Sequence, residues 1–470
     1  MLWRLCAILL AAATLAVWRV GALGPIGQST RRDVSLVVTG GAVVTMDPSG
    51  RVIDPGAVAV DGRDIVAVGP AAEITAQFNG ADTIDATGQV ILPGLINTHT
   101  HAPMVLFRGL ADDLALMEWL EKHIFPAEAK TVSPEFVRAG TRLAALEMIQ
   151  SGTTTYADMY YFEEEIAAAT KAAGIRGVLG QTIIQFPVAD AKTPSEGIAR
   201  ATTFLQQWSR DELIVPAIAP HAMYTLDTST IKAIRAVADR ERAPVIIHLA
   251  ETRDEVRIAR ERYKATPVQY LESIGFWGPR TIAAHGVWVN AADIRILARR
   301  HVGVAHNPES NMKLASGTAP VPDLQKAGVP VGLGTDGAAS NNDLDMFEAM
   351  RLAALLHKLT TGDPRALPAS TALKMATIDG ARVLGMEREI GSLETGKRAD
   401  LIAVSMSSAR QTPMYDPISH LVYTTRGDDV QTMVVNGRIV MRDRRVLTLN
   451  ERAVEDEARV WQAKIRPRVH

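Results

Sequence analysis

Short runs of alternating apolar and polar residues occur near both ends of the chain. Between 35 and 90 there are three, SLVVTGGAVVTMD, AVAVDGRDIVAVG and DTIDATGQVILPG, with Gly or Asp-Gly at the turns. Alternation with a period of two predicts strands joined by tight turns. The pattern returns at 399–405 and 430–446, where Asn436-Gly437 predicts a hairpin. Because a sheet of this size buries little core alone, both ends are predicted to form one β-sandwich domain around a larger inserted domain.

The middle of the chain, from about 91 to 385, alternates apolar strands with amphipathic helices. Helices are expected, for example, at 134–150, 162–173, 228–241 and 290–300. Eight strands are expected, at 90–98, 153–159, 177–184, 214–220, 244–249, 281–287, 301–306 and 329–335. Alternation of this kind predicts a parallel sheet with right-handed crossovers, and eight units predict an α/β fold of the (β/α)8 TIM-barrel type. A doubly wound open sheet is the alternative.

The N-terminal segment differs from the rest. Residues 5–18, LCAILLAAATLAVW, are continuously apolar between Arg4 and Arg19. Such a length fits the core of a signal peptide better than a membrane-spanning helix, and Val20 and Ala22 are small residues suited to a cleavage site. We therefore expect a protein that is exported or membrane-anchored through this segment. A cytoplasmic protein with a wrongly assigned start or a buried helix is the alternative.

The patterns divide the chain into five parts, and composition limits their function. The parts are a leader or anchor at 1–33, β-sandwich halves at 34–90 and 386–450, a metal-dependent barrel at 91–385 and a C-terminal helical tail at 451–470. Apolar residues make up 47% and charged residues 22% of the 470 residues, which is typical of a soluble globular protein. A net charge of −2 argues against binding nucleic acid through a broad basic face. Membrane contact is expected through 5–18 only, and a homo-oligomer is left open.

Cysteine and histidine usage narrows the chemistry. Cys6 is the single cysteine, so the chain has no internal disulfide and no cysteine-based zinc site, and a metal must be held by histidines and carboxylates. In a barrel, the C-terminal ends of the strands form one face, which carries the active site. Six of the eleven histidines fall at or just beyond those ends: His99, His101, His221, His248, His285 and His306. Six on one rim are difficult to explain as structural residues.

Four residues at the strand ends form a candidate ligand set for one metal. His99 and His101 lie two apart, so a strand directs both imidazoles to the same side. His248 ends VIIHLAE and adds a third nitrogen, and Asp336 ends VGLGTDG and adds an oxygen. This donor set suits Zn²⁺, with Fe²⁺ as the alternative. A single metal is preferred because neither VLGQTII nor IVPAIAPH contains the lysine that commonly bridges two metals.

Further groups on the same rim suggest proton transfer. Glu251 lies three residues after His248 and, as a carboxylate outside the ligand set, is suited to move protons between water and substrate. Asp336 is a second proton acceptor for the attacking water. His285, in TIAAHG, is placed to hydrogen-bond the developing tetrahedral centre. The alternatives are an exposed loop glutamate for Glu251, and a fifth ligand or core histidine for His285.

The motifs PGLINTHTHAPM, HLAET, AAHG, HNPESNMKLASG and LGTDGAASNN together resemble the amidohydrolase superfamily. Within it, the chain is most similar to the mononuclear deaminase and chlorohydrolase branch, in particular the 5-methylthioadenosine/S-adenosylhomocysteine deaminases, over about residues 35–450. The resemblance implies a barrel inserted in a composite β-sandwich. It also implies the same four metal ligands, with Glu251 as proton shuttle and His285 beside the attacking water.

The resemblance further implies substrate contacts. Glu128, in FPAEAK, matches the position that binds the ribose hydroxyls, a role suited to a carboxylate. His221, in APHAMYTL, matches a substrate-contacting histidine, and Trp119 is expected to add an aromatic wall. Arg200 lies near the stretch where an arginine for the amino-acid carboxylate of S-adenosylhomocysteine is expected. The alternative for Glu128 is a surface helix position without a ligand.

The function expected is hydrolytic deamination of the adenine ring of S-adenosylhomocysteine, 5-methylthioadenosine or adenosine, so the expected partner is a small nucleoside-like molecule. One alternative is a related amidohydrolase that acts on guanine, a triazine or another N-heterocycle. The other is a metal-binding or scaffold protein that has lost activity. The complete set of ligands and proton-transfer groups on one rim argues against the last.

Overall fold

Residues 31–466 are described by the computed structural model, so the apolar segment 5–18 lies outside the described residues. The barrel consists of eight parallel strands paired in chain order. They are β8 (Leu95–Thr100), β9 (Thr153–Tyr160), β10 (Arg176–Ile183), β11 (Ile214–Pro220), β12 (Val245–Leu249), β13 (Thr281–His285), β14 (Gly303–His306) and β15 (Val331–Leu333). Apart from two residues in β11, every residue of these strands is buried, as expected of a parallel sheet covered on both faces.

Side chains close the barrel between its first and last strands. Thr98 Oγ1 of β8 donates to the carbonyl of Leu333 at 2.8 Å, and Asn97 Nδ2 donates to Thr335 Oγ1 at 2.7 Å. Because the two strands meet, the expected (β/α)8 barrel is confirmed and the open doubly wound sheet is excluded.

Helices surround the barrel, and local sequence explains where several begin. Asn290 and Asp293 form a reciprocal capping box at α10 (Ala291–Arg299), and Asp227 caps α7 (Thr228–Glu241). The outer helices are α4 (Pro134–Ser151), α5 (Glu163–Ala173), α6 (Pro194–Trp208), α7 (Thr228–Glu241), α8 (Arg253–Tyr263), α9 (Pro267–Ser273), α10 (Ala291–Arg299), α12 (Val321–Lys326), α14 (Met346–Thr361), α15 (Ala369–Met375) and α16 (Ile378–Leu384). No helix within residues 31–466 is long and apolar enough to cross a lipid bilayer.

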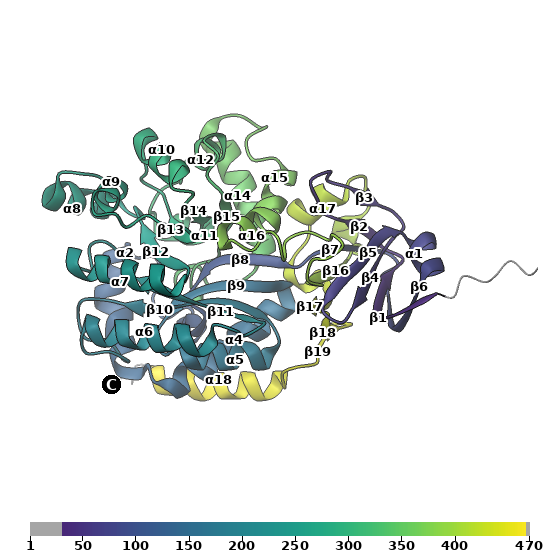
Figure 1. Cartoon of the computed structure of the whole chain (residues 1–470), viewed down its shortest axis with the longest axis horizontal. Coiled ribbons are helices and arrows are strands. Elements are labelled where there is room, and N and C mark those ends of the chain that lie inside the picture. Colours follow the sequence, from purple (N-terminus) through teal and green to yellow (C-terminus); the bar gives the residue numbers. More distant parts are fainter. Residues whose placement is uncertain (1–30, 467–470) are drawn as a thin grey trace, which may run out of the picture.

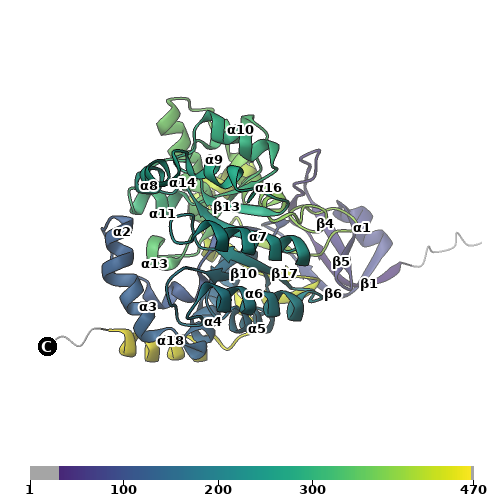
Figure 2. The same ribbon diagram turned by 60° about the vertical axis from the view of Figure 1, so that its left-hand side comes forward.

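Shorter helices follow the C-terminal ends of several barrel strands. The segment after β8 contains a π-helical turn, η2 (Leu120–Ile124), between α2 (Leu116–Trp119) and α3 (Phe125–Thr131). Such turns are frequent at functional sites. These elements are η1 (Ala102–Phe107), α2 (Leu116–Trp119), η2 (Leu120–Ile124), α3 (Phe125–Thr131), α11 (Pro308–Lys313) and α13 (Ala338–Asn341). Figure 2 shows α2 and α3 together at one side of the barrel, with α11 and α13 nearby.

Two sheets lie beside the barrel, on the right in Figure 1. One has the order β5-β4-β1-β6, with β1 (Arg32–Thr39), β4 (Gly56–Asp61), β5 (Asp64–Pro70) and β6 (Phe78–Asp85), and α1 (Ala71–Gln77) joins β5 to β6. The other has the order β19-β18-β17-β16-β7-β2-β3, with β2 (Ala42–Val44), β3 (Val52–Ile53), β7 (Gln89–Pro93), β16 (Leu401–Ser405), β17 (Val430–Val435), β18 (Arg438–Arg442) and β19 (Arg445–Val446). The second sheet combines strands from both ends of the chain.

The single strand expected at 90–98 is wrong, because Gly94 divides it. β7, before Gly94, pairs with β16 in the outer sheet, whereas β8, after it, begins the barrel. The Gly94 amide donates to the carbonyl of Asp400, and a Cβ at this position would lie 2.1 Å from Thr154. A continuous apolar run therefore crosses from one domain to the other at a residue that must lack a side chain.

The C-terminal helix α18 (Glu451–Ile465) packs along the barrel helix α4, as Figure 2 shows. Trp461 contacts Phe136 edge to face with ring centroids 5.4 Å apart, and Gln150 donates to Glu451 at 3.2 Å. Helix α18 is thus attached to the barrel.

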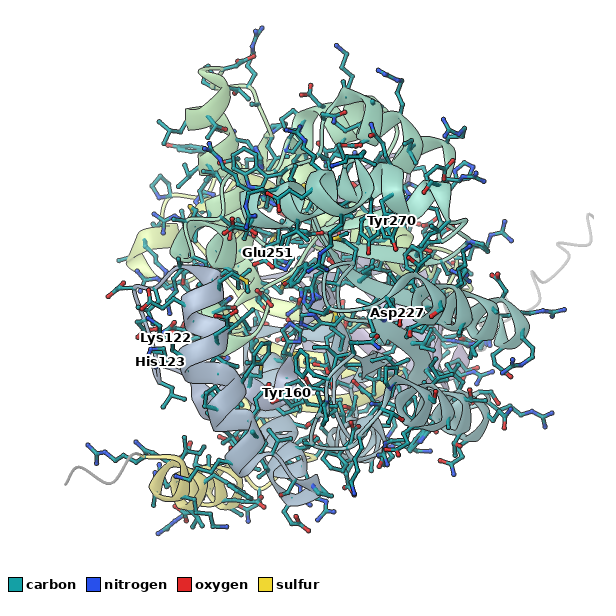
Figure 3. The ribbon with its side chains drawn as sticks, turned by 90° about the vertical axis from the view of Figure 1, so that its left-hand side faces the viewer. Lys122, His123, Tyr160, Asp227, Glu251 and Tyr270 are labelled. Carbon is teal, nitrogen blue, oxygen red and sulfur yellow. The ribbon has the colours of Figure 1, made fainter. Side chains whose placement is uncertain are left out.

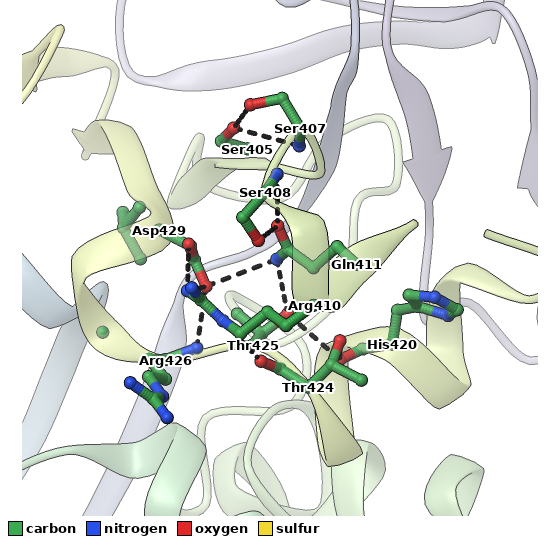
Figure 4. Close-up of polar contacts among 12 residues, drawn as sticks. Ser405, Ser407, Ser408, Arg410, Gln411, His420, Thr424, Thr425, Arg426 and Asp429 are labelled. Atoms are coloured by element: carbon green, nitrogen blue, oxygen red, sulfur yellow. Dashed lines mark hydrogen bonds and ion pairs between the residues drawn. The ribbon is translucent and has the colours of Figure 1, made fainter. Parts of the chain in front are cut away.

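Polar contacts stabilise the segment between β16 and β17. This segment contains η3 (Ala409–Gln411), α17 (Pro417–Tyr423) and η4 (Gly427–Asp429). Arg410 donates to both carboxylate oxygens of Asp429 at 2.5 Å, and Gln411 donates to the same carboxylate (Figure 4). The Gly427 amide in turn donates to Asp345, the cap of α14. This segment therefore holds the outer sheet against the barrel.

A buried ion pair joins the two domains. Arg176 at the start of β10 contacts both oxygens of Asp400 at 3.1–3.3 Å, and both side chains are 2% exposed. Arg176→Met should lower the free energy of unfolding by about 3–5 kcal/mol, because it leaves the Asp400 carboxylate buried without its cation. Urea denaturation measures the change. Arg176→Met combined with Asp400→Leu should recover most of the loss, and a single-variant loss below about 1 kcal/mol would contradict the assignment.

Candidate active site

Four side chains converge where the barrel strands end. His99 Nε2 and His101 Nε2, from β8 and the residue after it, lie 3.4 and 3.3 Å from Asp336 Oδ1. His248 Nε2, from β12, lies 3.3 Å from His101 Nε2. His99, His248 and Asp336 are buried and His101 is nearly so. The sequence placed these four residues on one rim, and the fold brings their donor atoms together.

Hydrogen bonds from outside the cluster orient these groups. His101 Nδ1 donates to the carbonyl of Met159 at 2.7 Å, and His248 Nδ1 donates to the carbonyl of His221 at 2.9 Å. Each bond directs the ring's other nitrogen into the cluster, as in metal sites where a second acceptor fixes the tautomer. Asp336 Oδ2 accepts from Ser310 Oγ at 2.7 Å and from Ser340 Oγ at 3.1 Å.

The electrostatics of the cluster favour a bound cation. Burial lowers the pKa of His99 to about 4 and that of His248 well below its usual value, so both rings are neutral donors. Burial also opposes ionisation of Asp336, but the imidazoles of His101 and His99 beside it hold the pKa of this carboxyl well below its usual range. Both ring nitrogens of His99 lack a hydrogen-bond partner among the described residues. Three imidazoles and an ionised carboxylate with an unused buried nitrogen fit a divalent transition metal.

Glu251 and His285 lie beside this cluster. Glu251 follows β12, is 6% exposed, and has Oε2 3.8 Å from His285 Nε2. His285 Nδ1 lies 3.0 Å from Asn311 Oδ1, which leaves Nε2 facing Glu251. Burial raises the pKa of the Glu251 carboxyl, so it retains a proton at a higher pH than an exposed glutamate does. A carboxyl that keeps its proton to a higher pH is suited to donate that proton to a substrate and to take one back.

The backbone is unusual at two of these positions. His285 has φ of 75° and Asp336 has φ of 61°, in the left-handed region that residues other than glycine rarely adopt. Such conformations persist where the surrounding structure imposes them, and they cluster at functional sites. Both are found where a barrel strand turns into the loop that shapes the site.

One cavity connects the cluster to the side chains expected to contact substrate. Its lining includes Trp119, Glu128 and His221, together with Glu251 and His285. Glu128 Oε1 accepts from the Tyr160 hydroxyl at 2.7 Å, and burial raises the pKa of Glu128 to about 7. His221 packs edge to face on His248 with centroids 4.8 Å apart. Figure 3 looks at this end of the barrel, with Glu251 and Tyr160 toward the middle.

Two candidates from the sequence lie elsewhere. Arg200, on α6, forms ion pairs with Glu164 and Asp190 and does not line the cavity. His306, at the end of β14, is buried against His357, with the two Nε2 atoms 3.2 Å apart, and also does not line the cavity. Although His306 lies at the end of a barrel strand, it packs inside the protein and does not contribute to the site.

Sequence reasoning missed the residues that orient the cluster. Ser310 and Asn311 lie in HNPESNMKLASG, and Ser340 lies in GTDGAASNN, two motifs recognised without a role for these residues. Tyr160, at the end of β9, was also missed. Its position at the C-terminal end of a barrel strand was the available signal.

Comparisons with known proteins agree with this geometry. Residues 90–440 match the model of the amidohydrolase family. The chain is 51% identical over 439 residues, 93% of its length and 100% of the relative, to a 5-methylthioadenosine/S-adenosylhomocysteine deaminase of Syntrophobacter fumaroxidans. It is 46% identical to a 5'-deoxyadenosine deaminase of Methanosarcina acetivorans, over 90% of this chain and 96% of that one. A zinc-bound adenosine deaminase structure from Xanthomonas campestris has a TM-score of 0.91 and 41% identity, covering 93% of this chain and 99% of that one.

Proposed function

The chain belongs to the amidohydrolase family, and from this premise we propose that it is a metal-dependent hydrolase of C–N bonds that deaminates adenine nucleosides. Its substrates would be S-adenosylhomocysteine, 5-methylthioadenosine or adenosine, and its products the hypoxanthine analogue and ammonia. The observation that carries the proposal is Glu251 facing the same cavity as the cluster of three histidines and Asp336. The names of the relatives and the zinc in the Xanthomonas structure agree with it.

One zinc ion is the proposed cofactor, with iron(II) as the alternative. His99, His101, His248 and Asp336 would hold it, because their donor atoms already lie close together and supply three imidazole nitrogens and a carboxylate oxygen. When bound, the ion supplies Lewis acidity that lowers the pKa of a coordinated water.

Side chains of the chain would carry the proton transfers. Addition of water to C6 forms a C–O bond, and loss of ammonia breaks the C–N bond to the amino group. Asp336, with His285 orienting the water, would accept the first proton that the water loses and pass it to the departing amino group, which leaves as ammonia. Glu251 would deliver a proton to the ring nitrogen next to C6 and take back the second water proton from the new C6 hydroxyl. The raised pKa of Glu251 supports this role, because a carboxyl that retains its proton can donate it to the ring nitrogen of the substrate.

Glu128 is the proposed ribose contact, with His221 and Trp119 as further walls of the substrate site. A carboxylate can accept hydrogen bonds from two adjacent hydroxyls, and the Tyr160 hydroxyl holds this one in place. A hydrolase acting on a ribose-free ring, such as guanine or a triazine, would have no use for this group.

A substrate panel tests the proposal. We expect the zinc-loaded protein to release ammonia from adenosine and its 5'-substituted analogues and to leave guanine and a chlorotriazine unchanged. Glu128→Ala should lower kcat/KM for adenosine by about 10²-fold, because two charge-assisted hydrogen bonds are lost. Glu118→Gln, an exposed glutamate on the neighbouring helix, is the control. If the protein acted only on a ribose-free ring, the proposed hydrolysis would stand, but adenine nucleosides would be rejected as its substrates.

A further inference from the structure

A group of three carboxylates lies outside the histidine cluster. Glu309 on α11, Asp343 between α13 and α14, and Glu348 in the first turn of α14 each place a carboxylate oxygen within 4.8 Å of the other two. Helix α11 contacts both α13 and α14, and the three helices lie on the left in Figure 2. None of the three carboxylates lines the active-site cavity. The group is therefore separate from the residues proposed to hold zinc.

Glu309 is the buried member of the group, and one of its oxygens is unused. Its side chain is 8% exposed, and Oε2 accepts from Asn341 Nδ2 at 2.9 Å. Oε1 is buried and has no hydrogen-bond partner among residues 31–466. Burying a carboxylate oxygen without a partner is costly. This oxygen therefore requires either a proton or a cation that the protein itself does not supply.

The basic side chains of the neighbouring segments are not paired with the group. Lys313, also on α11, bonds to Asp112 and Asn342, and Arg108 pairs with Glu147. Arg351, one turn along α14 from Glu348, is exposed. Within residues 31–466, no lysine, arginine or histidine forms an ion pair with any of the three carboxylates, whereas Lys313 pairs with Asp112. The negative charge of the group is thus left without a cation.

The carboxylates also raise one another's pKa. Burial, together with the charges of Asp343 and Glu348, raises the pKa of Glu309 well above its usual value. Burial and the charge of Glu348 raise the pKa of Asp343 to about 7. Because like charges destabilise each other's ionised form, a cation among them would be bound favourably.

The donor atoms indicate which cation fits. The group offers carboxylate oxygens without nitrogen or sulfur, which are the ligands of hard divalent cations. Calcium lies about 2.3–2.6 Å from each oxygen ligand, so two of its ligands are at most about 5 Å apart, in agreement with the spacing within the group. Magnesium demands stricter octahedral geometry and loses its waters reluctantly. Glu348 is exposed, so solvent and ions reach the group from its side.

We propose that Glu309, Asp343 and Glu348 form a binding site for one calcium ion, separate from the proposed zinc site. The ion would complete the unused oxygen of Glu309 and neutralise the repulsion among the three carboxylates. It would also join α11 to the segment between α13 and α14.

This calcium site would support the candidate zinc ligand Asp336. Ser310, the residue after Glu309, donates to Asp336 Oδ2 at 2.7 Å, and Ser340 on α13 donates to the same oxygen at 3.1 Å. Asn341, the residue after Ser340, bonds Glu309. Bound calcium would hold both serines in place, so we expect it to strengthen zinc binding.

Calorimetry on the full chain loaded with one equivalent of Zn²⁺ tests the site. One further equivalent of Ca²⁺ should bind with a Kd at or below about 1 mM, the weak limit of protein calcium sites, and Mg²⁺ should bind more weakly. Calcium at a hundred times its Kd should raise Tm by about 3 °C. If Glu309 is protonated instead, calcium will neither bind nor change Tm, which would refute the site. Tighter binding of Mg²⁺ would refute calcium as its ligand.

Substitutions locate the binding site. Glu309→Gln keeps the shape of the side chain but removes its charge, so it should weaken calcium binding at least tenfold and remove the rise in Tm (calcium affinity depends on the number of charged ligands). Without calcium, its Tm should not fall, because a neutral amide relieves the repulsion. Glu348→Gln changes an exposed position and should weaken binding similarly without affecting folding. The control, Glu261→Gln, changes an exposed glutamate on α8 and should bind calcium normally. Unchanged calcium binding in Glu309→Gln and Glu348→Gln would exclude these ligands.

The rate of zinc release tests the link between the two sites. Saturating calcium should slow the transfer of zinc to a chromogenic chelator by about fivefold or more, a typical coupling between sites, and should have no such effect in Glu309→Gln. An equal rate with and without calcium would contradict the support of Asp336. These measurements use no substrate, so failure of the calcium site and failure of the proposed deaminase activity are separate results.

Discussion

Glu251→Gln should lower kcat for deamination by about 10²–10⁴-fold, the range typical of a lost general acid–base group. The amide has nearly the same shape as the carboxyl but cannot transfer a proton to the ring nitrogen. Zinc content and thermal stability should stay near those of the unchanged protein, because Glu251 lies outside the four candidate ligands. Ammonia release measures the activity, and elemental analysis measures the zinc.

The matched control for this variant is Glu261→Gln on α8. Glu261 is exposed and pairs with Arg257 at 3.0 Å, so the same chemical change there should leave activity unaltered. Near-normal turnover by Glu251→Gln would reject the assigned proton transfer. Loss of zinc together with activity would instead show that Glu251 is a ligand.

Removing the metal should abolish activity, and one equivalent of Zn²⁺ per chain should restore it. The ligand atoms gather from three separate segments of the chain, at the ends of β8, β12 and β15, so zinc should also stabilise the fold. A ligand at a thousand times its dissociation constant adds about 4 kcal/mol, which appears as a rise in Tm. Activity assays and thermal melts before and after chelation measure both effects.

Histidine variants locate the metal. His101→Ala should lower zinc stoichiometry and activity together, because its Nε2 lies at the centre of the cluster. His123→Ala removes an exposed histidine on η2 and should change neither. Full activity after exhaustive chelation would contradict a metal-dependent mechanism. Two equivalents of zinc at saturation would contradict a single-metal site.

Several features of the site were predictable from the sequence because they depend on local spacing. A strand places residues two apart on the same side, so His99 and His101 had to share a direction. Barrel topology then brings strand ends together, which joins this pair to His248 and Asp336. The spacing of Glu251 after His248 was sufficient to suggest, though not to establish, that it faces the same cavity.

Other features depend on which side chains the folded chain brings into contact. His306 lies at a strand end as His248 does, yet it packs against His357 of α14, with the two Nε2 atoms 3.2 Å apart. Arg200 carries the positive charge that an amino-acid carboxylate would require, but it forms ion pairs with Asp190 and Glu164 instead. These pairings join residues far apart in the chain, so no local pattern predicts them.

The sequence by itself determined the barrel, the strands at both chain ends and the identity of the candidate ligands, since these follow from periodicity and residue type. Only the tertiary structure decided where Gly94 passes the chain from one sheet to the other, because that depends on contact with Thr154. It also decided that Phe125 and Phe186 contact each other edge to face, because they come from separate segments and meet only in the folded protein.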